Sequence, residues 1–201
     1  MNPRPAHSVT AVVLAGGGSR RFGSDKLAAH LAGTSLLEHL LDRLPADWPV
    51  VCVGAPRETH RSVSWVREDP PGGGPLSGIA AAVDWLTREA DRSLMRSIVV
   101  VIAGDMPHAA TAAPRLVADL LAAPTVSASV AEDETGHANP LLTAYRLDDL
   151  AAHLPRPAHD LPAKLLLRLP HRLVAIAGIA GRDVDTPEDL REISRGTQGS
   201  A

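Results

Sequence analysis

Short, almost continuously apolar segments alternate along the chain with stretches in which apolar residues recur every three or four positions. The first pattern is typical of strands buried on both faces, and the second of amphipathic helices. Strands are predicted over 9–15, 49–53, 63–66, 97–103, 126–130, 141–145 and 171–177. Helices are predicted over 35–44, 78–90, 112–122, 147–153 and 161–169, and a last helix begins at Thr186, with Pro187 in its first turn.

This alternation predicts an α/β fold: a Rossmann-like, open, mostly parallel sheet with helices on both faces. The 201 residues fit one domain, and no internal repeat or linker divides them. We therefore expect a single domain over 8–195 with flexible ends at 1–7 and 196–201. Ligands bind such sheets beyond the carboxyl ends of the strands, where the loops after Ala15 and at Asp105 fall.

Composition excludes several functional classes. The formal net charge is −3 and only 2% of residues are aromatic, which argues against a basic or base-stacking surface for nucleic acid. A single cysteine, Cys52, excludes a disulfide framework and a cysteine-based metal cluster. The longest apolar run, 98–103, is too short to span a bilayer, and the N-terminus lacks the apolar stretch of a signal peptide. We expect a cytoplasmic protein that binds neither nucleic acid nor membrane.

The loop after the first strand, residues 14–26, reads L-A-G-G-G-S-R-R-F-G-S-D-K. Successive glycines let backbone N–H groups close around an anion, and Arg20, Arg21 and Lys26 add positive charge that suits phosphate. A Walker A loop is excluded because Gly23 is not followed by Lys and Ser or Thr. A dinucleotide fingerprint is excluded because Arg21 stands where the third glycine is needed. Taken alone, the loop is also compatible with a structural turn.

Three further segments place glycines or carboxylates where a ligand is expected. The Gly/Pro loop 68–78 leads into a helix and is compatible with a turn alone. Asp105 follows the most apolar strand, where a carboxylate is costly unless it is hydrogen-bonded or holds a cation. Magnesium is usually bound by one or two carboxylates and substrate phosphates, although capping of the next helix is an alternative role for Asp105. In segment 183–190, Thr186 caps a helix, and the acidic residues at 183 and 185 are not needed for that cap.

Residues 14–26 resemble the pattern L-A-G-G-x-S-x-R-[FM]-G-x-D-K of the molybdenum cofactor guanylyltransferases and related nucleotidyltransferases, with every fixed position filled. Further matches are G-P-L-S-G at 74–78, G-D-M-P at 104–107, N-P-L at 139–141 and D-T-P-E-D-L at 185–190, so the resemblance covers nearly the whole chain. Many of these enzymes have Asn where this chain has Asp185, which leaves the second metal ligand open. The fold implied is that of the nucleotide-diphospho-sugar transferases.

The resemblance implies transfer of GMP from GTP to the phosphate of molybdopterin or the molybdenum cofactor, with release of pyrophosphate. Lys26 and Arg21 would stabilise charge on the triphosphate, and Asp105, with Asp185, would hold Mg²⁺. No general base is expected, because a phosphate nucleophile is already ionised at neutral pH. Molybdoenzymes and other cofactor-biosynthesis proteins are candidate partners. The implied nucleotide-binding residues are Leu14, Ala15, Gly16, Gly17, Lys26, Asp69, Gly74, Pro75 and Asp105.

Two alternatives stay open. The cytidylyltransferases of the same superfamily make the cytosine version of the cofactor, but they tend to show L-A-A-G where this chain has L-A-G-G at 14–17. This difference favours guanine. The other alternative is a nucleotide-binding regulatory module without turnover. No core motif residue is missing, which favours the enzyme.

Overall fold

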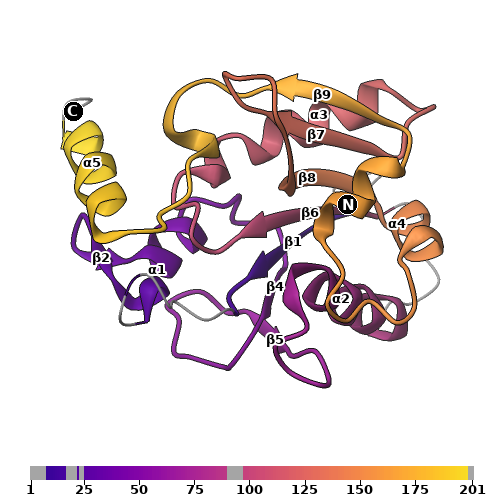
Figure 1. The fold of residues 1–201 in the computed structure, drawn as a ribbon, viewed down its shortest axis with the longest axis horizontal. Coiled ribbons are helices and arrows are strands. Elements are labelled where there is room, and N and C mark those ends of the chain that lie inside the picture. The colour runs from indigo at the N-terminus through magenta and orange to yellow at the C-terminus, as the bar shows by residue number, and fades with distance from the viewer. Residues whose placement is uncertain (1–7, 17–21, 23–24, 90–96, 199–201) are drawn as a thin grey trace, which may run out of the picture.

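The computed structural model describes residues 8–16, 22, 25–89 and 97–198. Its main sheet has seven strands in the order β5-β4-β1-β6-β8-β7-β9 (Figure 1). Strand β8 is antiparallel to both of its neighbours, and all other pairings are parallel. The predicted open, mostly parallel sheet is therefore confirmed. The strands are β1 (Val9–Leu14), β4 (Val50–Val53), β5 (Ser64–Val66), β6 (Ile98–Ala103), β7 (Ala128–Glu132), β8 (Ala138–Arg146) and β9 (His171–Ala175).

The helices follow the predicted order with two local differences. Helix α2 begins at Gly74, one turn before the predicted start, and the segment predicted over 161–169 is a 3-10 helix. A small hairpin, β2 (His30–Leu31) and β3 (Thr34–Ser35), was not predicted. The helices are α1 (Leu36–Leu41), α2 (Gly74–Glu89), α3 (Ala113–Ala122), α4 (Leu147–His153) and α5 (Pro187–Gln198), with 3-10 turns η1 (Lys26–Ala28), η3 (Ala109–Thr111), η4 (Ala163–Arg168) and η5 (Gly178–Gly181).

The core forms one layer on each face of the sheet, because successive side chains of a strand point to opposite faces. In β1, Ala11 and Val13 pack into the layer that contains the leucines of α1 and α3. Val12 packs into the opposite layer with Leu76 and Ile79 of α2 and the apolar residues of α4. Helices therefore cover both faces, as predicted (Figure 1).

A third apolar cluster attaches the C-terminal helix to the rest of the molecule. Leu31 of β2 and Leu36 of α1 pack against Val184 and against Ile193 of α5. In Figure 1, α5 accordingly lies beside β2 and α1. This packing holds the acidic segment 183–185 at the same side of the molecule as η1, which carries Lys26.

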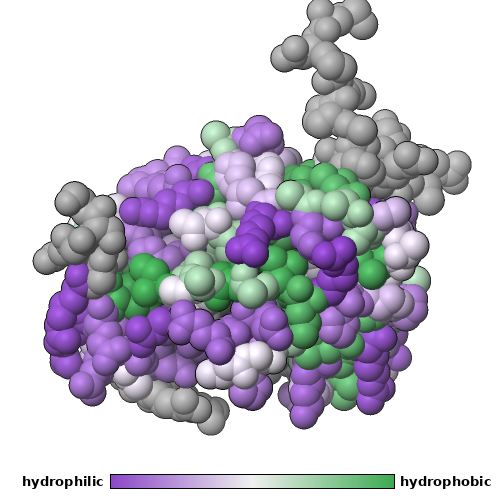
Figure 2. All heavy atoms as spheres, turned by 90° about the horizontal axis from the view of Figure 1, so that it is seen from above, coloured by the Kyte–Doolittle hydropathy of each residue, from purple (hydrophilic) through white to green (hydrophobic). Residues whose placement is uncertain are grey.

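The opposite end of the sheet exposes an apolar side chain close to an ion pair. Strand β9 is the edge strand, where Leu173 is 45% exposed and Arg172 forms an ion pair with Asp119 at 3.1 Å. Seen from this side, hydrophobic surface is interrupted by hydrophilic residues, which discourages pairing with another strand (Figure 2).

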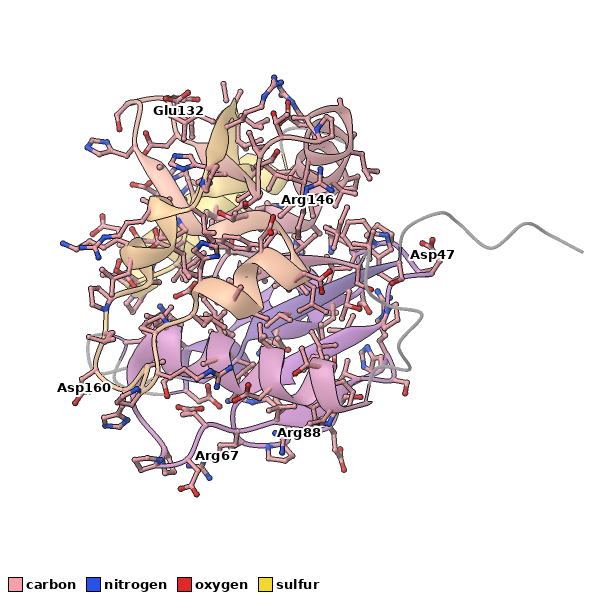
Figure 3. All side chains as sticks on the ribbon, turned by 90° about the vertical axis from the view of Figure 1, so that its right-hand side faces the viewer. Asp47, Arg67, Arg88, Glu132, Arg146 and Asp160 are labelled. Carbon is pink, nitrogen blue, oxygen red and sulfur yellow. The ribbon has the colours of Figure 1, made fainter. Side chains whose placement is uncertain are left out.

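Arg146, at the end of β8 (Figure 3), fixes the end of α3. Its guanidinium donates to the carbonyls of Leu120, Ala123 and Val126 at 2.9, 3.2 and 2.9 Å, and so satisfies acceptors that a helix leaves free at its C-terminus. Among the helices that the structure describes, none is both long and apolar enough to cross a membrane.

Candidate functional site

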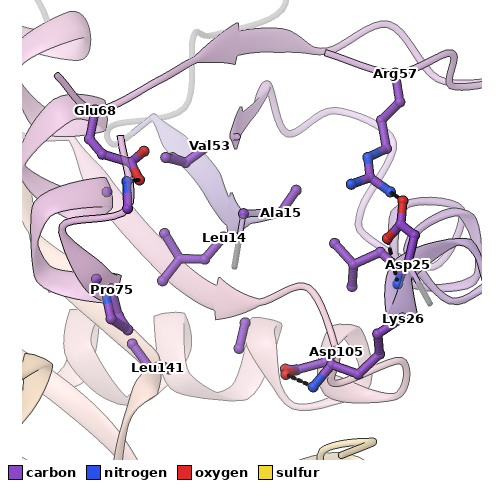
Figure 4. A pocket seen from close by; sticks show the side chains of 16 residues that line it. Leu14, Ala15, Asp25, Lys26, Val53, Arg57, Glu68, Pro75, Asp105 and Leu141 are labelled. Atoms are coloured by element: carbon purple, nitrogen blue, oxygen red, sulfur yellow. Dashed lines mark hydrogen bonds and ion pairs between the residues drawn. The ribbon is translucent and has the colours of Figure 1, made fainter. Parts of the chain in front are cut away.

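The carboxyl ends of β1, β4 and β6 meet at one edge of the sheet and border a pocket of about 420 Å³ (Figure 4). The register places Leu14 beside Val53 on one side and beside Ala103 on the other. Of the residues predicted to bind the nucleotide, seven line this pocket: Leu14, Ala15, Gly16, Lys26, Gly74, Pro75 and Asp105.

Two glycines let the loops at this edge pack closely. Gly104 donates its N–H to the Leu14 carbonyl at 3.0 Å, and a Cβ at this position would lie only 2.9 Å from that oxygen. Gly54, after β4, has a φ of +149°, and its Cβ would lie 2.9 Å from backbone atoms of Ala15 and Gly16. Glycine is therefore required at both positions, and this packing sets where Gly16 and Asp105 lie.

Lys26 brings together two carboxylates from distant parts of the chain. Its Nζ donates to Asp105 Oδ2 at 2.7 Å and to Asp185 Oδ1 at 3.0 Å. Partial burial alone would lower the pKa of Lys26, but the hydrogen bonds and negative charges of Asp105 and Asp185 outweigh it and raise that pKa. The side chain therefore stays an ammonium ion throughout the neutral range. The structure thus brings together three residues that the sequence singled out separately.

Local contacts hold Lys26 and the loop that carries Asp105 in place. Asp25 caps η1, because its Oδ1 accepts from the N–H of Leu27 at 3.2 Å. The other oxygen of Asp25 accepts from Arg57 Nη1 at 2.7 Å, which ties η1 to the loop after β4. On the far side, Val184 donates its N–H to the Asp105 carbonyl at 2.9 Å and so joins the segment around Asp185 to the loop after β6.

Helix α5 begins with a reciprocal cap that also fixes Asp185. Asp189 Oδ2 accepts from the backbone N–H groups of Asp185 and Thr186 at 3.0 and 2.7 Å, and from the Thr186 hydroxyl at 2.8 Å. In return, the N–H of Asp189 donates to Thr186 Oγ1 at 3.2 Å. The Thr186 hydrogen bonds lower the pKa of the Asp189 carboxyl. The predicted cap at Thr186 is therefore confirmed.

Negative charge exceeds positive charge around Lys26 in the described structure. Asp105 Oδ1 is buried and has no hydrogen-bond partner among the described residues. Burial, and then the negative charge of Asp105, raise the pKa of the neighbouring Asp183. Hard carboxylate oxygens with unused acceptor capacity suit a divalent cation such as Mg²⁺. Asp105 and Asp185 can therefore hold a metal beside the Lys26 ammonium group.

Several predicted residues were not placed in the pocket. Gly17 and Arg21 lie outside the described residues. Asp69 is exposed and does not line the pocket, whereas its neighbour Glu68 does and accepts from the N–H of Gly72 at 3.0 Å. A role of Asp69 in nucleotide binding stays a prediction.

The sequence interpretation gave no role to Asp25, Arg57 or Glu68, which all line the pocket. Arg57 follows the apolar segment 49–53 by four residues. A charged residue just beyond the end of a predicted parallel strand is the signal that could have found it.

Two buried histidines lie behind the Asp105 loop. The rings of His39 in α1 and His108 meet edge to face with their centroids 5.0 Å apart. Burial, followed by the positive charges of Arg43 and His108, lowers the pKa of His39 to about 4. Burial and Arg43 also lower the pKa of His108. Both rings are therefore neutral at neutral pH and pack as part of the core.

Comparisons with known proteins agree with this geometry. Residues 11–173 match the family model described as the MobA-like NTP transferase domain. A molybdenum cofactor guanylyltransferase of Bradyrhizobium sp. is 29% identical over 94% of this chain and 77% of its own length. A probable molybdenum cofactor guanylyltransferase of Chloroflexus aggregans is 31% identical over 73% of this chain and 70% of its own length. A molybdenum cofactor guanylyltransferase of Rhodopseudomonas palustris is 38% identical, but only over 42% of this chain and 43% of its own length.

Solved structures share the fold. Molybdopterin-guanine dinucleotide biosynthesis protein A from Archaeoglobus fulgidus has a TM-score of 0.69 and 21% identity, covering 94% of this chain and 99% of its own. Rv0371c from Mycobacterium tuberculosis in complex with manganese has a TM-score of 0.66 and 22% identity, covering 94% and 98%. At this level of identity, the two structures establish the fold alone. Because the family model matches most of its length, the chain belongs to the MobA-like NTP transferase family.

Proposed function

We propose that this protein is a molybdenum cofactor guanylyltransferase. It transfers GMP from GTP to the phosphate of molybdopterin or of the molybdenum-loaded cofactor, releases pyrophosphate and forms a guanine dinucleotide cofactor. Family membership and the names of the relatives support the proposal. One observation carries it: the Lys26 ammonium group lies between Asp105 and Asp185 in a pocket at the carboxyl edge of the sheet.

The two sides of the pocket suit the two parts of a nucleoside triphosphate. Leu14, Pro75 and Leu141 give one side an apolar character, whereas Lys26 and Asp105 make the other side charged (Figure 4). We assign the nucleoside to the apolar side at the start of α2 and the phosphates to the charged side. Backbone amides at Gly16 and Gly17, with the Arg21 side chain, are proposed to contact the phosphates. Asp69 and Gly74 are proposed to contact the nucleoside.

The proposed reaction needs positioning and charge neutralisation more than proton transfer. An ionised phosphate oxygen of the acceptor attacks the α-phosphorus of GTP, and the bond from that phosphorus to the β-phosphate oxygen breaks. The bonding electrons leave with pyrophosphate. Lys26, whose raised pKa keeps it charged, stabilises the negative charge that develops on the leaving group.

Asp105 and Asp185 fit the magnesium ion that this chemistry calls for. Both offer hard carboxylate oxygens, and Asp105 Oδ1 has no hydrogen-bond donor among the residues described. Magnesium is commonly held by one or two carboxylates together with substrate phosphates. When bound, Mg²⁺ would supply positive charge to the phosphates; the role of this chain is to hold it at Asp105 and Asp185.

A pyrophosphate-release assay with molybdopterin and Mg²⁺ tests the proposal, with GTP, CTP, ATP and UTP compared at equal concentration. We expect release with GTP and little with the other three. Release with CTP instead would contradict guanine specificity and place the protein among the cytidylyltransferases. No release with any of the four, from a protein that still binds a nucleotide, would contradict the proposed reaction and favour another acceptor or a regulatory module without turnover.

A further inference from the structure

A second group of potential metal ligands lies where α1 faces the loop between β4 and β5. Glu38, Asp42 and His60 each offer one ligand atom, and these atoms all lie within 4.8 Å of one another. Glu38 and His60 also line a surface hollow of about 650 Å³, which shares no lining residue with the nucleotide pocket. The group is therefore separate from the site built around Lys26.

Glu38 supplies a buried carboxylate oxygen without a hydrogen-bond donor. Its side chain is only 10% exposed. Oε1 accepts from the N–H of His60 at 3.0 Å, whereas Oε2 has no hydrogen bond within the described parts of the chain and lies 3.4 Å from His60 Nδ1. Burial of a carboxylate oxygen without a donor or cation is costly. Glu38 Oε2 therefore points toward His60 with unused capacity to bind a cation.

The charges around this group also call for a cation. Glu38 lies in the first turn of α1 and Asp42 is its C-cap residue, so the two negative charges are four residues apart and repel each other, and that of Asp42 also opposes the helix dipole. No Lys or Arg of the described chain forms an ion pair with either residue. The nearby Arg61 instead donates to backbone carbonyls, including those of Leu41 and Leu44. A bound dication would offset both negative charges.

The geometry and the donor types indicate which cation. Two atoms bound tetrahedrally to one zinc ion at about 2.0–2.1 Å lie about 3.4 Å apart, which is the separation of Glu38 Oε2 and His60 Nδ1. An imidazole among the ligands favours Zn²⁺ over Mg²⁺ or Ca²⁺, which prefer oxygen alone. We infer that Glu38, Asp42 and His60 bind a zinc ion, with water in the fourth position. The ion would join α1 to the loop that carries Arg57, a residue of the nucleotide pocket.

Calorimetric titration of the full-length protein with Zn²⁺, in excess Mg²⁺, tests this inference. We expect one zinc ion per chain, and Co²⁺ at the same site should give the visible absorption of a tetrahedral nitrogen–oxygen site. His60→Ala and Asp42→Asn should each weaken zinc binding at least tenfold, since each removes one of three ligands. His60 is 73% exposed at its side chain and Asp42 is exposed, so neither change disturbs the core.

Two further variants make the result decisive. His153→Ala, which removes an exposed histidine of α4, should leave zinc affinity unchanged. Asp105→Asn should also leave it unchanged, because that carboxylate belongs to the nucleotide pocket. The inference is overturned if the wild-type protein binds no zinc, if His60→Ala and Asp42→Asn both bind zinc as tightly as the wild type, or if Asp105→Asn abolishes binding. None of these outcomes depends on guanylyltransferase activity.

Discussion

The two acidic clusters of this molecule offer similar ligands but are balanced differently. At the nucleotide pocket, the Lys26 ammonium group forms ion pairs with Asp105 and Asp185, which come from segments far apart in the chain, and offsets one of their two negative charges. On α1 and at its C-cap, Glu38 and Asp42 lie near the imidazole of His60, and neither forms an ion pair with a Lys or Arg of the described residues. A permanent positive charge suits the binding of a triphosphate together with its Mg²⁺, whereas a cluster without one suits a cation alone. Burial and carboxylates alone therefore do not distinguish the two kinds of site; the cation beside them does.

Helix α1 links the two clusters. Glu38 faces the β4–β5 loop, and the adjacent His39 packs against His108, three residues after Asp105. The clusters are therefore connected through this short helix and its pair of neutral rings, and also through the β4–β5 loop, whose Arg57 pairs with Asp25.

Asp105→Asn should have the largest effect on the nucleotide pocket. The change removes the charge that pairs with Lys26 and the best candidate ligand for magnesium. We expect turnover to fall by about 10²-fold or more, the range for loss of one charge-stabilising group. Steady-state pyrophosphate release measures this, with Asp148→Asn on the exposed surface of α4 as the control. Near-normal turnover of Asp105→Asn would exclude the proposed role.

Lys26→Ala should weaken GTP binding by about tenfold or more, because hydrogen bonds to charged groups contribute about 1.5–3 kcal/mol. Calorimetry with GTP and Mg²⁺ measures the affinity. The chain offers a matched control in Lys164, its only other lysine, which is exposed in η4. Zinc binding at Glu38, Asp42 and His60 should not change in either variant. An unaltered GTP affinity in Lys26→Ala would contradict the proposal that Lys26 binds the phosphates of GTP.

The buried His39 ring, which lies between the two clusters, should make the stability of the protein depend on pH. Its pKa is lowered from 6.5 to about 4 by burial and by the charges of Arg43 and His108, so between these values the folded chain binds fewer protons than the unfolded chain. Stability is therefore lost as the pH falls through this window, by about 2 kcal/mol between pH 8 and pH 5 for this one group.

Urea unfolding at pH 8 and pH 5 measures that loss. His39→Gln should reduce the dependence on pH, whereas His153→Ala, at an exposed position, should preserve it. The interpretation is wrong if the wild-type protein is equally stable at both pH values, or if His39→Gln loses as much stability as the wild type.

Cys52 should have the smallest effect. Burial, followed by the negative charge of Glu38, raises the pKa of its thiol to about 12, so it stays protonated and does not act as a metal ligand. Cys52→Ala should leave turnover unchanged and cost about 1 kcal/mol of stability, as typical substitutions do. The folded wild-type protein should also resist alkylation at pH 8. A folded Cys52→Ala variant without activity would show that Cys52 has a role beyond packing.

The central parallel strands β4, β1 and β6 were predictable because they are nearly continuous apolar runs, a signal that needs no knowledge of partners. The direction of β8 was not, because apolar residues at 141–145 indicate a strand but not its neighbours. The hairpin β2–β3 was also missed, since two residues per strand are too few for a period to appear. The run of glycines and prolines before α2 suggested a loop, although Pro75 is compatible with a first helical turn.

For the functional site too, single residues could be predicted from local motifs, whereas their contacts could not. Lys26, Asp105 and Asp185 could be singled out because each stands in a local motif, yet their convergence is a property of the folded chain. The Asp25–Arg57 ion pair joins residues 32 positions apart in segments without a shared pattern, so the sequence did not show that these two residues pair. The same is true of Glu38 and His60, which meet only because the β4–β5 loop folds back onto α1.

The most direct test of the central claim is to follow the phosphates of GTP through the reaction. The protein is incubated with molybdopterin, Mg²⁺ and GTP labelled at either the α- or the γ-phosphate. We predict that the α-label appears in a molybdopterin product and the γ-label in pyrophosphate, in equal amounts. Transfer of the γ-label to molybdopterin, or its release as free phosphate without a labelled molybdopterin product, would contradict nucleotidyl transfer.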